Sequence, residues 1–300
     1  MNEKVITSYK AFDKNMKCRN FQYEVGKEYE MDGEIKCCNR GFHACKSPME
    51  VWNYYDMLNS RYAEVEQSGK IDEEGNSTKV CSSHIKIKAE LKLADIIKVG
   101  VEWLKDITSP SKVKADGALN DSGDSAQIGS SGDSAQIGSS GYSAQIGSSG
   151  YYAKIGSSGD SAQIGSSGDS AQIGSSGYSA KIGSSGDSAQ IGSSGDSAQI
   201  GSSGDSAQIG SSGYYAKIGS SGYYAKIDST GEDSIIMCAG NCSIAKAKVG
   251  SWITLAEWKW SDEKNHNVPV CVKTEYVDGE NIKADTWYQL KNGKFVEVQK

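Results

Sequence analysis

Four residues near the N-terminus carry side chains that bind zinc in other proteins. Cys37, Cys38, His43 and Cys45 occur in the order CC-x4-H-x-C. Thiolate and imidazole groups are the ligands that Zn²⁺ prefers. The spacing matches no common zinc motif, and buried thiols beside a hydrogen-bonded histidine would explain the same residues. We therefore expect no bound metal, with these four residues as the candidate ligands if one binds.

A second set of residues could act on a dinucleotide. Arg19 lies upstream of a predicted strand that contains Glu64-Val65-Glu66. The order GFHACKSP, helix, RYAEVE resembles the strand–helix–strand core of ADP-ribosyltransferase-like folds. The resemblance implies that Arg19 positions NAD and that Glu64 or Glu66 supports an oxocarbenium-like centre. However, an ExE sequence is also typical of a half-buried strand with solvated glutamates, and the Ser-Thr-Ser motif of these enzymes is absent.

Other catalytic signatures are missing from the sequence. None of His43, His84 and His266 belongs to a recognisable Ser-His-Asp or Cys-His arrangement. The GSSG phrases precede neither Lys-Thr nor a predicted helix, so they do not form a phosphate-binding loop. We therefore favour a protein without catalytic activity or cofactor. An NAD-using enzyme of the ADP-ribosyltransferase-like kind is the alternative.

The candidates above lie in an expected α+β domain over residues 1–110. SYKAF, RYAEVE and HIKIKAEL read as strands, and Asp32-Gly33 is typical of a hairpin turn inside EYEMDGEIK. Ser47-Pro48-Met49-Glu50 combines a capping box with proline at the first helical position, which predicts a helix over residues 49–58. Residues 94–107 predict an amphipathic helix that leads into the next segment.

A nine-residue phrase fills the middle of the chain, from Asn120 to Ile227. One unit reads G-S-S-G-[DY]-[SY]-A-[QK]-I, in which Ala and Ile alternate with polar residues. This alternation is typical of a strand with one buried face, and the GSSG segment turns the chain. A strand and a turn repeated without a helix predict a β-solenoid with an internal isoleucine ladder. A flexible linker would have no reason to keep isoleucine at one fixed phase.

Two known repeat families help to interpret these units. The aspartates do not reproduce the ligand set of the calcium-binding nonapeptide rolls, and several units carry tyrosine instead. The phrase G-D-S-A-x-I-G is similar to the repeats of trimeric adhesin heads, which are left-handed β-rolls. The similarity supports a roll and does not by itself imply adhesion.

The fifth position of the unit indicates how many units form one coil. With two units per coil, one column alternates between aspartate and tyrosine from Asp124 to Tyr214. With three units per coil, adjacent aspartate pairs would stack directly on one another. Like charges in direct cross-strand contact are unfavourable. We therefore expect two units, or 18 residues, per coil.

Three units differ from the rest because tyrosine occupies both variable positions and lysine follows. Tyrosine offers a large, rigid and amphipathic contact, and it is enriched at binding surfaces. Duplication of a few parental units, or packing of the last tyrosines against a C-terminal cap, would also explain the pattern. The predicted binding surface is Tyr151, Tyr152, Lys154, Tyr214, Tyr215, Lys217, Tyr223, Tyr224 and Lys226.

The two ends of the solenoid should be capped, because open strand edges otherwise pair with other chains. We place the solenoid with its degenerate end coils at residues 111–249 and a β-rich C-terminal domain at residues 250–300. Within that domain, Lys291-Asn292-Gly293-Lys294 is a strong type I′ hairpin signal. The expected fold class is mainly β, with an α+β domain at one end and a β-rich cap at the other.

Composition restricts the expected partners. The net charge is −6, which argues against a nucleic-acid partner. No segment is long and apolar enough to span a bilayer, and the first residues, MNEKVITSYK, do not resemble a secretion signal. We expect a cytoplasmic protein without a membrane partner, whose eight cysteines are reduced.

Both ends of the chain resemble one family. YKAFDKNMKCRNFQYEVGKEYE with GFHACKSPMEVWNYY is similar to an uncharacterised N-terminal domain of phage and prophage proteins. In that family short Gly-rich repeats follow, and then a tail like VDGENIKADTWYQLKNGKFVEV. The resemblance implies a viral or prophage origin and no particular activity. We expect a non-enzymatic protein that binds a host or viral protein, with inhibition of a host factor or defence as one outcome of that binding. Self-association and a structural role in the virion are the alternatives.

Overall fold

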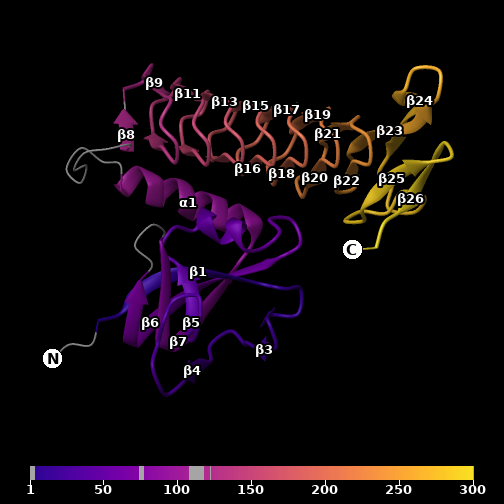
Figure 1. The fold of residues 1–300 in the computed structure, drawn as a ribbon. Coiled ribbons are helices and arrows are strands. Elements are labelled where there is room, and N and C mark those ends of the chain that lie inside the picture. Colours follow the sequence, from indigo (N-terminus) through magenta and orange to yellow (C-terminus); the bar gives the residue numbers. More distant parts are fainter. Residues whose placement is uncertain (1–3, 74–77, 108–117, 122, 300) are drawn as a thin grey trace. The chain divides into compact units, whose positions relative to one another are not determined.

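The computed structural model describes residues 4–73, 78–107, 118–121 and 123–299 (Figure 1). The chain is mainly β, as the sequence predicts. It divides into two compact units, with the boundary between Trp103 and Leu104. The finer division at residues 110 and 249 stays a prediction. No helix in the described ranges has both the length and the apolarity needed to cross a membrane.

The N-terminal unit is built around a small closed sheet. Pairings of β5 with β1, β1 with β6, β6 with β7 and β7 with β5 close a ring of antiparallel strands, and β4 adds to β7. Alternate residues point into the ring, where Val65, Ile85 and Ile87 are fully buried beside Phe12 and Phe42. The elements are β1 (Ile6–Phe12), β2 (Lys17–Cys18), β3 (Phe21–Gln22), β4 (Glu28–Glu30), β5 (Phe42–Cys45), β6 (Arg61–Glu73), β7 (Lys79–Leu91) and α1 (Leu93–Ile107).

The helix expected over residues 49–58 is wrong in both type and length. Only a short 3₁₀ helix forms, Met49–Asn53, and Pro48 precedes it without a side-chain cap. The Glu50 carboxylate, which would complete a capping box, instead accepts hydrogen bonds from the backbone N–H and the hydroxyl of Thr78. The Glu50 carboxylate therefore bonds to a residue distant in sequence, and it does not cap the helix as the local pattern predicts. The helix expected over residues 94–107 is confirmed as α1.

The hairpin expected around Asp32-Gly33 is also wrong. β4 pairs with β7, so that Glu28 lies opposite Lys86 and Glu30 opposite His84. The long β7 strand pairs with β5 only through its first residues. Its later residues on the same edge pair with β4. A distant strand partner therefore takes the place of the local one.

In the second unit the repeats form a β-solenoid of two sheets. Each strand pairs in parallel with the strand 18 residues later, for example Ile146 with Ile164 and Ile155 with Ile173. Two units therefore make one coil, as the fifth-position pattern predicts. The nine-stranded sheet contains β9 (Gln127–Ser130), β11 (Gln145–Ser148), β13 (Gln163–Ser166), β15 (Lys181–Ser184), β17 (Gln199–Ser202), β19 (Lys217–Ser220), β21 (Ile235–Cys238), β23 (Trp252–Ser261) and β24 (His266–Tyr276).

The other sheet has ten strands. They are β8 (Ala118–Asp121), β10 (Gln136–Ser139), β12 (Lys154–Ser157), β14 (Gln172–Ser175), β16 (Gln190–Ser193), β18 (Gln208–Ser211), β20 (Lys226–Ser229), β22 (Ile244–Lys246), β25 (Tyr288–Lys291) and β26 (Lys294–Glu297). Odd-numbered units thus contribute to one sheet and even-numbered units to the other.

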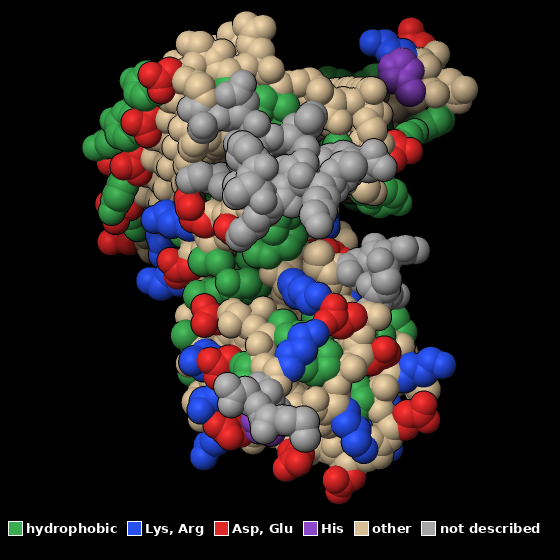
Figure 2. All heavy atoms as spheres, turned by 90° about the vertical axis from the view of Figure 1, so that its left-hand side faces the viewer, with side chains coloured by type: hydrophobic (Ala, Val, Ile, Leu, Met, Phe, Trp, Pro, Cys, Tyr) green, Lys and Arg blue, Asp and Glu red, His purple; other side chains and the backbone are tan. Residues whose placement is uncertain are grey.

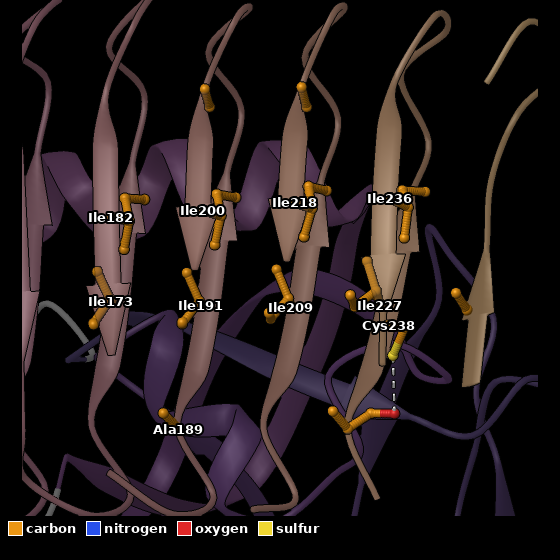
Figure 3. Packing of buried hydrophobic residues seen from close by; sticks show 14 of the residues in the cluster. Ile173, Ile182, Ala189, Ile191, Ile200, Ile209, Ile218, Ile227, Ile236 and Cys238 are labelled. Atoms are coloured by element: carbon orange, nitrogen blue, oxygen red, sulfur yellow. Dashed lines mark hydrogen bonds between the residues drawn. The ribbon is translucent and has the colours of Figure 1, made fainter. Parts of the chain in front are cut away.

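Isoleucines from both sheets fill the space between them. Ile164 and Ile173, in the middle of the array, are 3% and 0% exposed, and the alanines two positions before them, Ala162 and Ala171, are fully buried. Figure 3 shows the ladder from Ile173 to Ile227 facing the ladder from Ile182 to Ile236. Burial of each isoleucine stabilises the fold by about 1.5–3 kcal/mol. The predicted internal ladder is confirmed.

The second glycine of each GSSG phrase is required by the stacking of coils. A Cβ at Gly168 would lie 1.9 Å from the carbonyl oxygen of Gly150, one coil earlier. No side chain fits between turns that approach so closely. The same clash, at 1.8–2.1 Å, recurs at this position from Gly141 to Gly240.

Antiparallel hairpins end both sheets at the C-terminal side. β23 pairs in parallel with β21 and then turns back to pair with β24, while β25 and β26 continue the ten-stranded sheet. Asn292 and Gly293 between β25 and β26 have φ values of 50° and 65°. Positive φ at both central residues is the requirement of a type I′ turn, so this predicted hairpin is confirmed.

Candidate functional site: the rims and outer face of the solenoid

The turns of the solenoid form two rims, and both rims carry exposed tyrosines. The first rim consists of the turns that precede strands of the nine-stranded sheet, and the second rim of those that precede strands of the ten-stranded sheet. In Figure 2 hydrophobic and acidic side chains lie side by side along one edge of the solenoid. The exposed tyrosines are Tyr142, Tyr178, Tyr214 and Tyr215 on the first rim and Tyr151, Tyr152, Tyr223 and Tyr224 on the second, with exposed fractions of 42–62%.

Aspartate at the fifth position of a unit has a structural role that tyrosine cannot replace. The Asp187 carboxylate accepts the backbone N–H of Asp205 at 2.7 Å, and Asp205 accepts the N–H of Tyr223 at 2.8 Å. The same bond links Asp133 to Tyr151, Asp169 to Asp187 and Asp196 to Tyr214, whereas Asp160 does not form it with Tyr178. A tyrosine in this position has no carboxylate to offer to the next coil. Each such tyrosine therefore forgoes a hydrogen bond worth about 1 kcal/mol.

The sixth position also favours a small residue. Tyr152, Tyr215 and Tyr224 have φ values of 55–57°, the left-handed region that bulky residues rarely adopt. Serine or another small polar residue occupies this conformation in neighbouring units, such as Ser170 and Ser188. The tyrosine pairs therefore stand where two features of the turn favour Asp-Ser. Their presence is not explained by the stability of the turn.

The structure distributes the predicted binding residues over both rims. Tyr151 and Tyr223 lie on the second rim, four coils apart, whereas Tyr214 lies on the first. Lys154 and Lys226 begin strands of the ten-stranded sheet, and Lys217 begins a strand of the nine-stranded one. The prediction omitted Tyr142 and Tyr178, which alternate with Asp124, Asp160 and Asp196 along the first rim. The alternation in the sequence was the signal that could have identified them.

The outer face of the nine-stranded sheet forms a shallow groove of about 1200 Å³. Its floor is the first glycine of every second GSSG phrase, the phrases that belong to the nine-stranded sheet, and glutamine or lysine side chains stand beside it. A Cβ at these glycines would meet nothing within 4 Å, and their φ values are not positive. Neither packing nor backbone conformation requires glycine here, and glycine weakens a strand. The floor glycines are Gly129, Gly147, Gly165, Gly183, Gly201 and Gly219.

This groove ends at an apolar patch. Ile235, Trp252 and Tyr276 continue the row of Lys217 across β21, β23 and β24. All three are exposed, by 53%, 48% and 43%, and Met237 beside Ile235 is 53% exposed. The Trp252 and Tyr276 ring centres lie 5.1 Å apart. The groove and the patch were not predicted, because GSSG was assigned wholly to turns and the residues of the patch were expected only to end and cap the solenoid.

The candidate catalytic residues in the N-terminal unit do not converge on one site. Arg19 is exposed between β2 and β3, beside a pocket that is described below. Neither Glu64 nor Glu66 lines that pocket, and Glu66 forms an ion pair with Lys88 at 2.6 Å. An ADP-ribosyltransferase-like centre would need arginine and glutamate around one substrate.

Two of the candidate zinc ligands come together with a third residue that the sequence did not indicate. The ligand atoms of Cys37, His43 and Cys81 lie within 4.8 Å of one another, because β5 and β7 place His43 opposite Cys81. Cys38 is exposed and Cys45 is buried, and neither belongs to this cluster.

The bonding of the cluster is that of protonated thiols. Cys37 Sγ donates to the carbonyl of Asp72 at 3.3 Å, and Cys81 Sγ donates to that of Arg40 at 3.2 Å. Burial raises the pKa of Cys81 to about 12. His43 Nε2 accepts the backbone N–H of Cys38 at 3.0 Å. Zn²⁺ would need deprotonated thiols and a free imidazole nitrogen, so these residues do not fit a metal as they are bonded here.

Residues 6–99 match a protein family described as a domain of unknown function (DUF7666). The matched segment covers the closed sheet of the N-terminal unit and ends within α1. No curated protein and no solved structure matches the chain. The match thus concerns the N-terminal unit alone.

Proposed function

We propose that this chain is a non-enzymatic binding protein that holds a protein partner on the rims and outer face of its solenoid. The observation that carries the proposal is the set of eight exposed tyrosines on the two rims. Three of them occupy a left-handed backbone position, and those at the fifth position replace an aspartate that would bond to the next coil. Residues that oppose turn stability and remain exposed are typical of a binding surface.

The groove beside the first rim supports the same proposal. A floor of glycines exposes flat backbone, which lets a partner approach more closely than a row of side chains would. The exposed patch around Ile235, Met237 and Trp252 supplies apolar area at the end of this groove. Rim aspartates and a net charge of −6 oppose a nucleic acid, so a polypeptide is the partner that this chemistry suits.

The resemblance of both ends to phage and prophage proteins supports a partner inside an infected cell. A rigid surface that binds a host protein in the cytoplasm could inhibit a host factor or a host defence. The finer assignment, to phage origin and host inhibition, depends on that resemblance.

Affinity capture with a consensus variant tests the proposal. Tyr151-Tyr152, Tyr214-Tyr215 and Tyr223-Tyr224 are each replaced by Asp-Ser. We expect the captured partner to fall by about tenfold or more. The melting temperature should stay close to that of the unmodified chain, because restored hydrogen bonds and the relief of the left-handed positions offset the like-charge contacts between stacked aspartates. Trp260→Ser with Val270→Ser is the matched control, because it removes exposed apolar area from β23 and β24.

The proposal would be contradicted if the consensus variant captured the same proteins in the same amounts. A change in solution mass in the consensus variant, without any loss of a captured protein, would assign the tyrosines to self-association instead.

A further inference from the structure

The N-terminal unit contains a pocket of about 1020 Å³ that the solenoid proposal does not use. Residues of β1, the β2–β3 turn, β5 and the end of the 3₁₀ helix line it, and Lys79 of β7 closes one side. Three of the lining residues are cationic: Lys10, Arg19 and Lys79. None of the described lining residues is a carboxylate.

Lys10 is the unusual residue of this pocket. Its side chain is almost fully buried, and no carboxylate among the described residues pairs with it. Nζ donates to the carbonyl of His43 at 2.7 Å and to Cys18 Sγ at 3.5 Å. The same ammonium group lies 5.6 Å from the ring centre of Phe12 and 5.4 Å from that of Tyr23, so its neighbours are a carbonyl, a thiol and two rings, none of which carries a full negative charge. Burial lowers the pKa of Lys10, because a buried charge without a counter-ion is unfavourable.

The three cations act on one place. Burial is the main cause that lowers the pKa of His43, and the charges of Lys10, Lys79 and Arg19 lower it further. The geometric basis for this is that Lys10, Arg19 and Lys79 all line the same pocket. A pocket with three cations and no carboxylate among its described lining residues is suited to a compact anion such as a phosphate group.

Aromatic rings form the rest of the wall. Phe21 is 44% exposed and lies 4.8 Å from Tyr23, and Tyr54 is 47% exposed beneath Lys79, whose Nζ lies 4.4 Å from the ring centre. Exposed rings beside cations stack on planar groups. The volume is at the upper end of the range of small-ligand pockets, about 300–1000 Å³, and a free phosphate would leave most of it empty.

We propose that this pocket binds a nucleotide, with the phosphate on Lys10, Arg19 and Lys79 and the base against Phe21 or Tyr54. This proposal is independent of the partner bound by the solenoid.

Calorimetric titration of the full chain tests the proposal. The probes are AMP, UMP, ADP and NAD⁺, with adenosine, uridine and inorganic phosphate as comparisons. At least one nucleotide should bind about tenfold or more tightly than its nucleoside and than phosphate. Arg19→Gln should weaken nucleotide binding by about tenfold, and Lys10→Met by at least as much. Lys17→Gln is the control, because it removes another exposed charge, from β2 and outside the pocket.

Phe21→Leu separates the two halves of the site. It should weaken the nucleotide and leave the affinity for inorganic phosphate unchanged. Because Arg19 and Phe21 are exposed, these variants remain informative even if Lys10→Met fails to fold. Absence of binding to every probe, equal binding of phosphate and nucleotides, binding only of a phosphotyrosine peptide offered in parallel, or equal affinity in Arg19→Gln would each overturn the proposal.

Discussion

The repeats that form the nine-stranded sheet contain two glycines with different roles, although the two look alike in the sequence. Gly168 is enclosed by the backbone of the preceding coil, whereas Gly165 on the outer face of β13 has open space around its Cα. The first role belongs to the fold and the second has no structural cause. This distinction separates the residues that maintain the solenoid from those that we assign to its binding surface.

Alanine at the two glycines should give opposite results. Gly168→Ala places Cβ 1.9 Å from a carbonyl oxygen, so we expect a loss of more than about 2 kcal/mol of unfolding free energy. Gly165→Ala fills open space and should raise the unfolding free energy by about 0.5–1 kcal/mol. Denaturant unfolding of both variants measures this, and equal destabilisation would show that the strand glycines are structural as well.

At the scale of elements, the repeats were predictable and the N-terminal unit was less so. The same pattern occurs in twelve copies, so a chance feature of one copy does not mislead the prediction. The alternation of Ala and Ile therefore identified the strands, and the residues at the fifth position identified the number of units per coil. The turn at Asn292-Gly293 depends only on local backbone preference and was also predictable. The predictions of a capping box at Glu50 and of a hairpin at β4 were wrong, because partners distant in sequence, Thr78 and β7, determine the structure there.

The candidate sites were likewise predictable only where a local sequence pattern marks them. The tyrosines were visible as departures from a repeat, and their exposure follows from the turn that holds them. The groove was hidden because its glycines look like turn residues. Cys81 and Lys10 are brought to their neighbours by strand pairing, which no local pattern in one sequence reveals.

The last coil of the ten-stranded sheet contains a buried ion pair whose strength should depend on pH. Asp228 and Lys246 replace strand glycines there and lie 3.0 Å apart, with side chains 5% and 17% exposed. Burial raises the pKa of Asp228, and Lys246 opposes that rise. A carboxyl group whose pKa is raised by folding stabilises the fold most at low pH, and this contribution is lost as pH rises through the folded pKa.

Removing the Lys246 cation should therefore lower the unfolding free energy only at pH values at which Asp228 is charged. We expect Lys246→Met to lower the unfolding free energy by about 3 kcal/mol at neutral pH, because it leaves a buried carboxylate without its partner. The loss should shrink as the pH is lowered from neutral to acidic values, because the carboxyl group then becomes protonated. Lys283→Met, which removes one member of an exposed pair with Glu297, is the control. A loss of the same size at neutral and at acidic pH would count against a buried charge as its cause.

At the scale of the whole molecule, the two units offer two kinds of surface. The N-terminal unit has a cationic and aromatic pocket, which suits a small anionic ligand. The solenoid has long exposed rims and an open groove, which suit a macromolecule. The central claim of this account is that the rims of the solenoid hold the partner.

Site-specific photo-crosslinking tests that claim most directly. A benzophenone side chain replaces Tyr178 on the first rim, Tyr152 on the second rim, or Val270 on β24 as an exposed control. In cells that produce the chain, we predict adducts to one and the same protein from positions 178 and 152, and none to that protein from position 270. Adducts to a partner from position 270 with none from either rim would contradict the account.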